Sequence, residues 1–129
     1  MEHKVMKLMR RGAITCTQDT SIQEVAQIMV VNKIRYCVVV DEKHEVKGII
    51  SARSMLRAFG KDLEKTRAKD ILLPYTVTIT PNSLLKEAAD LMSKKRIGHL
   101  IVVSDRPGSG RVILGLLHAE DVVANMAEN

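Results

Sequence analysis

Aromatic residues are scarce in this chain, which has two tyrosines, one phenylalanine and no tryptophan among 129 residues. Single-stranded nucleic acids are bound by stacking bases on aromatic side chains, so a stacking surface of that kind is disfavoured. Carbohydrate platforms and aromatic cages need the same side chains and are disfavoured for the same reason. The remaining composition is that of a globular protein, 46% hydrophobic and rich in β-branched residues, which favour strands.

Side chains that bind metals or form disulfides are also few. Cys16 and Cys37 each lie in an apolar stretch without CxxC spacing, which predicts two free core thiols and a reducing compartment. No two histidines have the i,i+4 spacing of a helical metal site, and no cysteine is near enough in sequence to complete a zinc set. We therefore expect no metal site and no resident cofactor. The four histidines are His3, His44, His99 and His118.

Long apolar runs and catalytic motifs are missing as well. No run approaches the roughly 18 residues of a membrane span, and the N-terminus has no apolar signal core, which predicts a cytoplasmic protein without a membrane segment. There is no Gly-x-Ser-x-Gly or Walker motif and no cysteine that looks activated, so we expect no enzyme. The net charge of +5 is distributed along the chain. It permits nucleic-acid binding, but a solvated basic surface that attracts polyphosphates is the favoured interpretation.

What the sequence does contain is an internal repeat. A shift of 63 positions places residues 14–17 on 77–80 and residues 38–40 on 101–103. After a four-residue insertion in the second copy, residues 48–51 align with 115–118. The same order of features in both halves predicts two copies of one fold.

Each copy has the pattern strand, helix, strand, strand, helix after a short apolar lead. Ser21 and Glu24 form the capping box that is typical of a helix start, while the second copy has Leu84 in place of the capping serine. The nearly unbroken apolar strands predict burial on both faces. The expected leads are 5–9 and 68–72; the strands are 14–17, 36–40, 46–50, 77–80, 99–103 and 112–117; and the helices are 22–32, 52–59, 84–95 and 119–127.

A unit of about 60 residues buries too little surface to be stable alone. We therefore expect an α+β fold in which two β-α-β-β-α repeats pack sheet to sheet around a pseudo-twofold axis as one compact module. The expected repeats are residues 1–62 and 63–129, the second including a linker at 63–69. Clefts between equivalent positions of the two copies would suit a small ligand.

The candidate binding segment is Gly-Leu-Leu-His-Ala-Glu-Asp at residues 115–121. The apolar pair after Gly115 predicts the end of a buried strand, and Asp121 falls in the first turn of the final helix. Its carboxylate can accept hydrogen bonds from two neighbouring ligand hydroxyls, while the free N–H groups of the helix start can face an anion. Ribose plus phosphate fits that pairing. A plain dipole-complementing role for Asp121 is the alternative.

Three motifs recur in both copies, and together they resemble a tandem pair of CBS domains, the modules named after cystathionine β-synthase. The first motif is a Thr-containing strand before a helix start, TCT with IQE at residues 15–17 and 22–24, and TIT with LKE at 78–80 and 85–87. The second is IRYCVVVD at 34–41 and IGHLIVVS at 97–104. The third is the pattern Gly-apolar-apolar-Thr/Ser-x-x-Asp at 48–54 and 115–121. The resemblance covers essentially the whole chain.

The resemblance implies a regulatory, energy-sensing module that binds an adenosyl ligand (AMP, ADP, ATP or S-adenosylmethionine) between the repeats. The last Asp of the third motif would hold the ribose, and adenine would lie against the first-motif and second-motif strands of the partner repeat. The implied main site comprises Asp121, His118, Leu116, Thr17, Ile34, Arg35 and Tyr36. The implied second site comprises Ser51, Ser54, Ile49, Thr80, Ile97, Gly98 and His99.

Two positions depart from the family pattern. Ser54 stands where the ribose-binding Asp is usual, and a neutral hydroxyl accepts weaker hydrogen bonds than a carboxylate, whose bonds are about twice as strong. His118 stands where Thr or Ser is usual, although histidine can donate to a phosphate. These departures favour the Asp121 site as the occupied one.

Apolar stripes on the last helix of each copy predict a homodimer. Because the chain contains no catalytic effector domain, we expect ligand occupancy to be signalled to a separate effector protein by direct contact. A ligand-free dimerisation scaffold and a nucleic-acid-binding regulator remain the alternatives. The stripe residues are Met55, Leu56, Phe59, Val122, Val123 and Met126.

Overall fold

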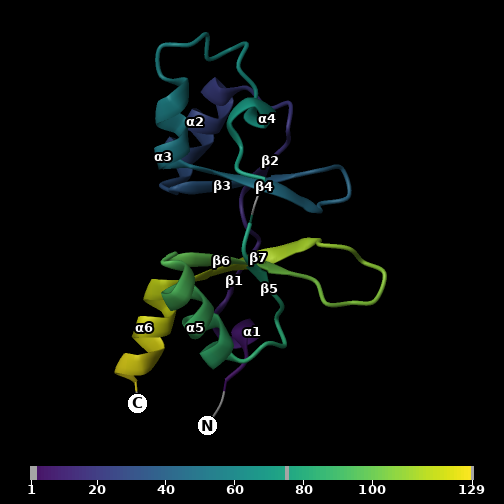
Figure 1. Ribbon diagram of the computed structural model, residues 1–129, viewed down its shortest axis with the longest axis vertical. Coiled ribbons are helices and arrows are strands. Elements are labelled where there is room, and N and C mark those ends of the chain that lie inside the picture. The colour runs from purple at the N-terminus through teal and green to yellow at the C-terminus, as the bar shows by residue number, and fades with distance from the viewer. Residues whose placement is uncertain (1–2, 75, 129) are drawn as a thin grey trace. The chain divides into compact units, whose positions relative to one another are not determined.

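The computed structural model describes residues 3–74 and 76–128, which form two compact units. The continuous unit is Ile14–Thr76. The composite unit combines the N-terminal segment up to Ala13 with the segment from Val77 onwards. Each unit is a small sheet with helices packed on it, so the expected α+β class is confirmed (Figure 1).

The continuous unit holds a three-stranded sheet of order β2-β3-β4, with β2 parallel to β3 and β4 antiparallel to it. The expected strand at 36–40 is confirmed, and the next strand is one residue longer than expected. The elements are β2 (Thr15–Cys16), α2 (Ile22–Asn32), β3 (Tyr36–Val40), β4 (Val46–Ser51), α3 (Ala52–Met55), the 3-10 helix η1 (Leu56–Ala58) and α4 (Ala68–Ile71).

The composite unit holds a four-stranded sheet of order β1-β7-β6-β5. Here β5 runs parallel to β6, while β7 is antiparallel to both β6 and β1. The elements are α1 (Val5–Leu8), β1 (Arg10–Arg11), β5 (Thr78–Ile79), α5 (Leu85–Lys95), β6 (His99–Val103), β7 (Ile113–His118) and α6 (Ala119–Ala127).

Helices α2 and α5 correspond to each other in the repeat; α2 has the expected bounds, and α5 begins one residue later than expected, at Leu85. Ser21 accepts a hydrogen bond from the backbone N–H of Glu24 at 3.2 Å, as expected of an N-cap, whereas Leu84 makes no side-chain cap. Each helix ends at a residue in the left-handed conformation, Lys33 with φ 54° and Arg96 with φ 56°.

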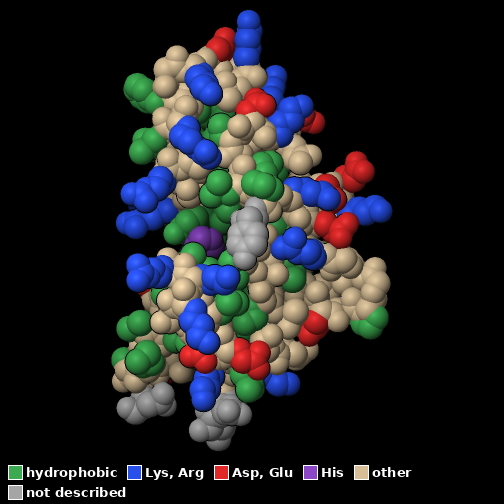
Figure 2. Space-filling model, in the orientation of Figure 1, with side chains coloured by type: hydrophobic (Ala, Val, Ile, Leu, Met, Phe, Trp, Pro, Cys, Tyr) green, Lys and Arg blue, Asp and Glu red, His purple; other side chains and the backbone are tan. Residues whose placement is uncertain are grey.

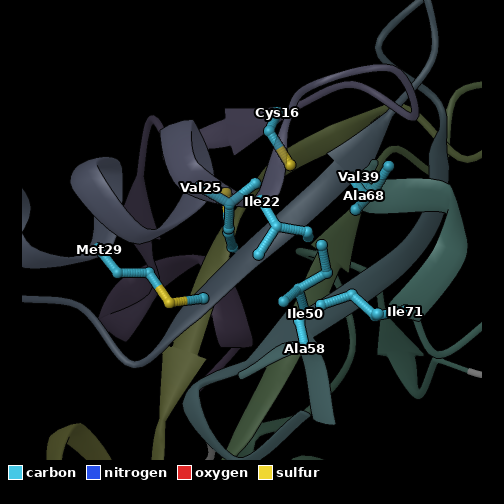
Figure 3. Packing of buried hydrophobic residues seen from close by; sticks show 10 residues of the cluster. Cys16, Ile22, Val25, Met29, Val39, Ile50, Ala58, Ala68 and Ile71 are labelled. Carbon is cyan, nitrogen blue, oxygen red and sulfur yellow. The ribbon is translucent and has the colours of Figure 1, made fainter. Parts of the chain in front are cut away.

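Each unit has its own hydrophobic core. In the continuous unit the buried side chains of α2, β2, β3, β4, η1 and α4 point toward one another, as the labelled residues of Figure 3 show. Cys16 and Cys37 are free thiols buried in this core, as expected. The residues of β3 that point to the opposite face, Val38 and Val40, are buried too, which confirms the prediction of burial on both faces.

The units do not coincide with the consecutive halves 1–62 and 63–129, because the two apolar leads are exchanged. The first lead, α1, packs with the second copy, where Leu85 donates its backbone N–H to His3 O at 2.7 Å. The second lead, α4, packs with the first copy, where Ile22 donates its N–H to Thr66 O at 2.9 Å. These bonds give partners to N–H groups that a helix start leaves unsatisfied.

The expected linker at 63–69 is a packed part of the continuous unit. Leu63 accepts a backbone hydrogen bond from Gln23 at 3.1 Å, and its side chain packs against the core. Ala68 is fully buried. The sequence indicated only a linker here, whereas backbone carbonyls of this stretch accept hydrogen bonds from the first turn of α2 and its apolar side chains pack in the core.

The expected helix at 52–59 is shorter and less regular than the sequence indicated. It forms one turn of α-helix, α3, and then tightens into η1, which buries Ala58 completely. Phe59 leaves the helical conformation with ψ 128°, and Gly60 follows with φ 91°, a value that favours glycine.

Candidate functional site

Asp121 lies at the start of α6, directly after the strand that the candidate segment was expected to form. His118 is the N-cap of this helix and still has extended backbone angles, φ −102° and ψ 145°. The helix start is attached to the sheet, because Ala119 donates its N–H to Gly98 O at 2.9 Å. The Asp121 side chain is 23% exposed. This placement gives a carboxylate held by regular structure on both sides yet open to solvent.

Both carboxylate oxygens of Asp121 accept hydrogen bonds from Arg10. Arg10 donates Nε–H to Oδ2 and Nη2–H to Oδ1, each at 3.0 Å, in the side-on bidentate geometry that favours Arg–carboxylate pairs. β1 brings Arg10 there by pairing with β7, with Arg10 opposite Leu116. The hydrogen bond with Asp121 raises the pKa of Arg10 above its usual value. Arg10 was absent from the expected site, and no local signal identifies it, because the pair joins residues 111 positions apart.

Two histidines expected in different sites are neighbours on the composite sheet. His99 on β6 and His118 on β7 are cross-strand partners. Burial, with a smaller contribution from His118, lowers the pKa of His99 from 6.5 to about 4. Burial and then the charge of Arg10 lower the pKa of His118, and the nearby carboxylates of Asp121 and Glu120 only partly oppose them. Both rings are therefore neutral at pH 7, and each can donate one hydrogen bond.

The corresponding place in the continuous unit is closed by a helix cap. Ser54 accepts a hydrogen bond from the backbone N–H of Ser51 at 2.8 Å, and Ser51 Oγ accepts one from Ser54 N–H at 3.0 Å. The Ser54 hydroxyl also donates to Ser51 O at 3.0 Å, and the residue is only 5% exposed. The Ser54 hydroxyl thus caps the start of α3. A ligand could form a hydrogen bond with it only by breaking this cap.

The first-motif threonines lie in matching turns. Thr17 Oγ1 is 3.2 Å from Thr20 Oγ1, and Thr80 Oγ1 is 3.0 Å from Ser83 Oγ. In both turns the backbone N–H of the later residue also donates to the threonine carbonyl. Each threonine therefore keeps a hydroxyl near the end of the short first-motif strand, β2 or β5.

The second-motif residues of the expected sites precede or begin β3 and β6. Ile34 and Ile97 are half-buried and pack against the cores, while Arg35 and Gly98 are exposed. Tyr36 opens β3 and is the cross-strand partner of Ser51, just as His99 is the partner of His118. Ile49 is buried in β4, and Leu116 is half-buried in β7.

Each expected site draws its residues from both units, so each unit contains half of the residues expected for each site, here called a half-site. The composite unit brings together the Leu116, His118 and Asp121 half of the main site and the half of the second site at Thr80 and 97–99. The continuous unit brings together the remaining halves.

Other kinds of site find little support in the described residues 3–74 and 76–128. Within them, no group of three His, Cys, Asp or Glu side chains is placed to hold a metal ion. Over that same part of the chain, none of the helices combines the length and the apolar character that crossing a membrane requires. On the face shown in Figure 2, Lys and Arg side chains are spread over both units instead of forming one basic patch.

Comparisons with known proteins agree with the duplicated fold. The CBS domain pair of protein MJ0100, solved in complex with 5′-methylthioadenosine and S-adenosyl-L-methionine, has a TM-score of 0.85 and 24% identity, covering 99% of this chain and 98% of that chain. CBSX2, solved in complex with AMP, has a TM-score of 0.84 and 20% identity, covering 98% and 97%. At these identities the likeness shows a shared fold.

Curated relatives are longer than this chain. A homoserine O-acetyltransferase from Methanosalsum zhilinae is 26% identical over 118 residues, which are 92% of this chain but 23% of the relative. The chain spans about a quarter to a half of the first curated relatives it matches. The family model for the CBS domain matches residues 5–61 and again residues 68–128, so the chain belongs to the CBS domain family and carries two copies of the domain.

Proposed function

We propose that this chain is a regulatory CBS pair that binds an adenosyl ligand between its repeats and signals occupancy to an effector protein. The observation that carries the proposal is the position of Asp121, a partly exposed carboxylate at the N-terminal turn of α6. Such a carboxylate can accept both hydroxyls of a ribose, and the helix start favours an anion beside it. Solved pairs of the same fold hold AMP, 5′-methylthioadenosine or S-adenosylmethionine.

In the proposed main site, Asp121 binds the ribose and neutral His118 donates a hydrogen bond to ribose or phosphate. Thr17, Arg35 and Tyr36 of the continuous unit would complete the cleft around the adenine. The second site would use Thr80, Gly98 and His99 with Ser51. We expect it to bind more weakly, because the Ser54 hydroxyl is already engaged in the cap of α3.

Calorimetric titration tests this assignment. AMP, ATP and S-adenosylmethionine are titrated separately into the wild-type protein, into Asp121→Ala and into the matched control Asp90→Ala, an exposed carboxylate on α5. We expect at least one ligand to bind the wild type and the control equally and Asp121→Ala about tenfold or more weakly, as for a lost charge-assisted bond. Equal affinity for all three proteins would refute the role of Asp121.

A ligand-free dimerisation scaffold is the second candidate, and two contacts favour it. The Ser54 hydroxyl is engaged in the cap of α3, and the Asp121 carboxylate is already paired with Arg10. A scaffold would bind none of the three ligands and would still assemble. Native mass spectrometry of the purified protein separates the two functions, because it shows both the size of the assembly and any nucleotide that co-purifies.

A further inference from the structure

We infer that Arg10 makes the Asp121 half-site selective for adenosyl ligands that carry phosphate over those that are neutral or cationic. The inference rests on the proposed function, and it names the ligand class for that site. It begins from the bidentate pair of Arg10 and Asp121, which lies wholly within the composite unit.

The pair leaves both partners able to bind more. A guanidinium has five N–H donors, and Asp121 occupies two of them, so three remain for a phosphate. A carboxylate has about four lone-pair positions, so Asp121 keeps acceptor capacity for ribose hydroxyls while it is paired. The Arg10 side chain is 58% exposed, which leaves its free donors accessible. A ribose and its phosphate could therefore be bound side by side.

The charges at the half-site point the same way. Asp121 alone would present a negative charge and would favour the sulfonium cation of S-adenosylmethionine over a nucleotide. Arg10 neutralises that charge and offers a fork that matches phosphate geometry. The negative charge of Glu120 also interacts with Arg10 and would repel an anionic ligand. Its side chain is exposed, however, so solvent screens this repulsion. His118 is neutral at pH 7 and leaves the positive charge to Arg10.

The other repeat provides an internal comparison, because it forms the same backbone arrangement without the ion pair. Leu73 stands at the position that corresponds to Arg10, and it bridges Ile49 on β4 just as Arg10 pairs with Leu116 on β7. Ser54 stands at the position of Asp121. In this repeat, leucine and serine therefore replace the arginine and the aspartate, and the serine is engaged in the cap of α3. The backbone contact with the neighbouring strand is still present. The pair is therefore not needed for the fold, and leucine is compatible with this backbone position.

Binding of three probes distinguishes the roles of the two residues. Adenosine, AMP and S-adenosylmethionine are titrated into wild type, Arg10→Leu, Arg10→Lys and the control Arg11→Leu, whose side chain points to the other face of β1. We expect the wild type and Arg11→Leu to bind AMP about tenfold more tightly than adenosine. Arg10→Leu should lose that preference and bind adenosine within about twofold of wild type, and Arg10→Lys should retain part of it.

An unchanged ratio of AMP to adenosine affinity in Arg10→Leu would overturn the inference and leave the proposed function standing. So would a wild type that binds S-adenosylmethionine more tightly than AMP. If the wild type binds none of the three probes, the proposed function fails and the inference fails with it. Thermal unfolding of each variant checks that the fold is retained.

Discussion

Ser54 and Asp121 occupy the same position in the two repeats, the third residue of the final helix, but their side chains have different partners. Ser54 is buried and bonds back to Ser51 at the helix start. Asp121 is partly exposed and accepts hydrogen bonds from Arg10 on β1. One repeat therefore uses this position to close a helix, while the other presents a carboxylate and a guanidinium to solvent. Predictions about the two positions differ accordingly.

Ser54→Ala should lower the free energy of unfolding by about 1–2 kcal/mol. It removes the acceptor for Ser51 N–H and leaves that group without its cap partner. Urea denaturation measures the change, and Ser93→Ala, at an exposed position of α5, is the control. A urea midpoint equal to that of wild type would show that water replaces the hydrogen bonds of the cap without loss of stability.

Asp121→Ala should change the free energy of unfolding by less than about 1 kcal/mol, although it should weaken ligand binding about tenfold or more. Arg10 is mostly exposed, and ion pairs at exposed positions contribute little to stability. A double-mutant cycle with Arg10→Leu should give a coupling energy of roughly 0.5 kcal/mol. A coupling of several kcal/mol would instead assign the pair a structural role.

Gly115→Ala should detach β1 from β7. An added Cβ would collide with the backbone carbonyl of Arg10, which cannot move without breaking the strand pair. We expect a loss of roughly 2–4 kcal/mol of stability together with the AMP preference that Arg10 confers. Urea denaturation and the titrations above measure both effects.

The control for the effect on stability is Gly98→Ala, because nothing lies within 4 Å of a Cβ added there. Gly48→Ala is the matched substitution in the other repeat, where the added Cβ would lie 2.6 Å from Leu73 O. It should destabilise the protein similarly without involving Arg10. A Gly115→Ala variant as stable as Gly98→Ala would contradict the close approach of β1.

The stability of the protein should fall as the pH is lowered from about 6.5 to about 4. In this window an unfolded histidine takes up a proton while half-buried His99, with its pKa lowered to about 4, does not. Protons then favour the unfolded state, and His99 costs on the order of 1–2 kcal/mol after allowance for partial solvent screening.

His99→Tyr tests this contribution, since Tyr36 is the residue at the corresponding position of the other repeat. Urea midpoints at pH 7 and pH 4.5 should differ less for this variant than for wild type. His44→Asn is the control, because His44 is exposed and asparagine tolerates its left-handed backbone, φ 61°. Equal pH dependence of wild type and His99→Tyr would contradict the assignment to His99.

A homodimer at micromolar concentration remains our prediction, with the apolar stripes at its interface. Four stripe residues are well exposed, while Met55 and Val122 pack against their own cores. The double variant Phe59→Lys with Met126→Lys should sediment as a monomer, and Gln27→Lys, an exposed position of α2, should not change the assembly. A monomeric wild type would refute the prediction. The exposed stripe residues are Leu56 72%, Phe59 87%, Val123 60% and Met126 65%.

The sequence alone determined the parts of the fold that depend on local patterns. The strands at 36–40 and 99–103 and the last helix at 119–127 were predicted with the bounds that the structure has, because an apolar run or an amphipathic period within a few residues specifies each. The cap at Ser21 was predicted because its partner is three residues away. The duplication also identified both copies and placed Asp121 at a helix start.

Only the tertiary structure decided which distant segments meet. Each apolar lead packs on the other copy because that copy supplies the unsatisfied N–H groups and the apolar surface that the lead covers. Arg10 meets Asp121 because β1 pairs with β7, and Ser54 turns inward because its hydroxyl has a partner at the helix start. Such contacts join residues far apart in the chain or depend on how a side chain turns, and no pattern within a short stretch of sequence encodes them.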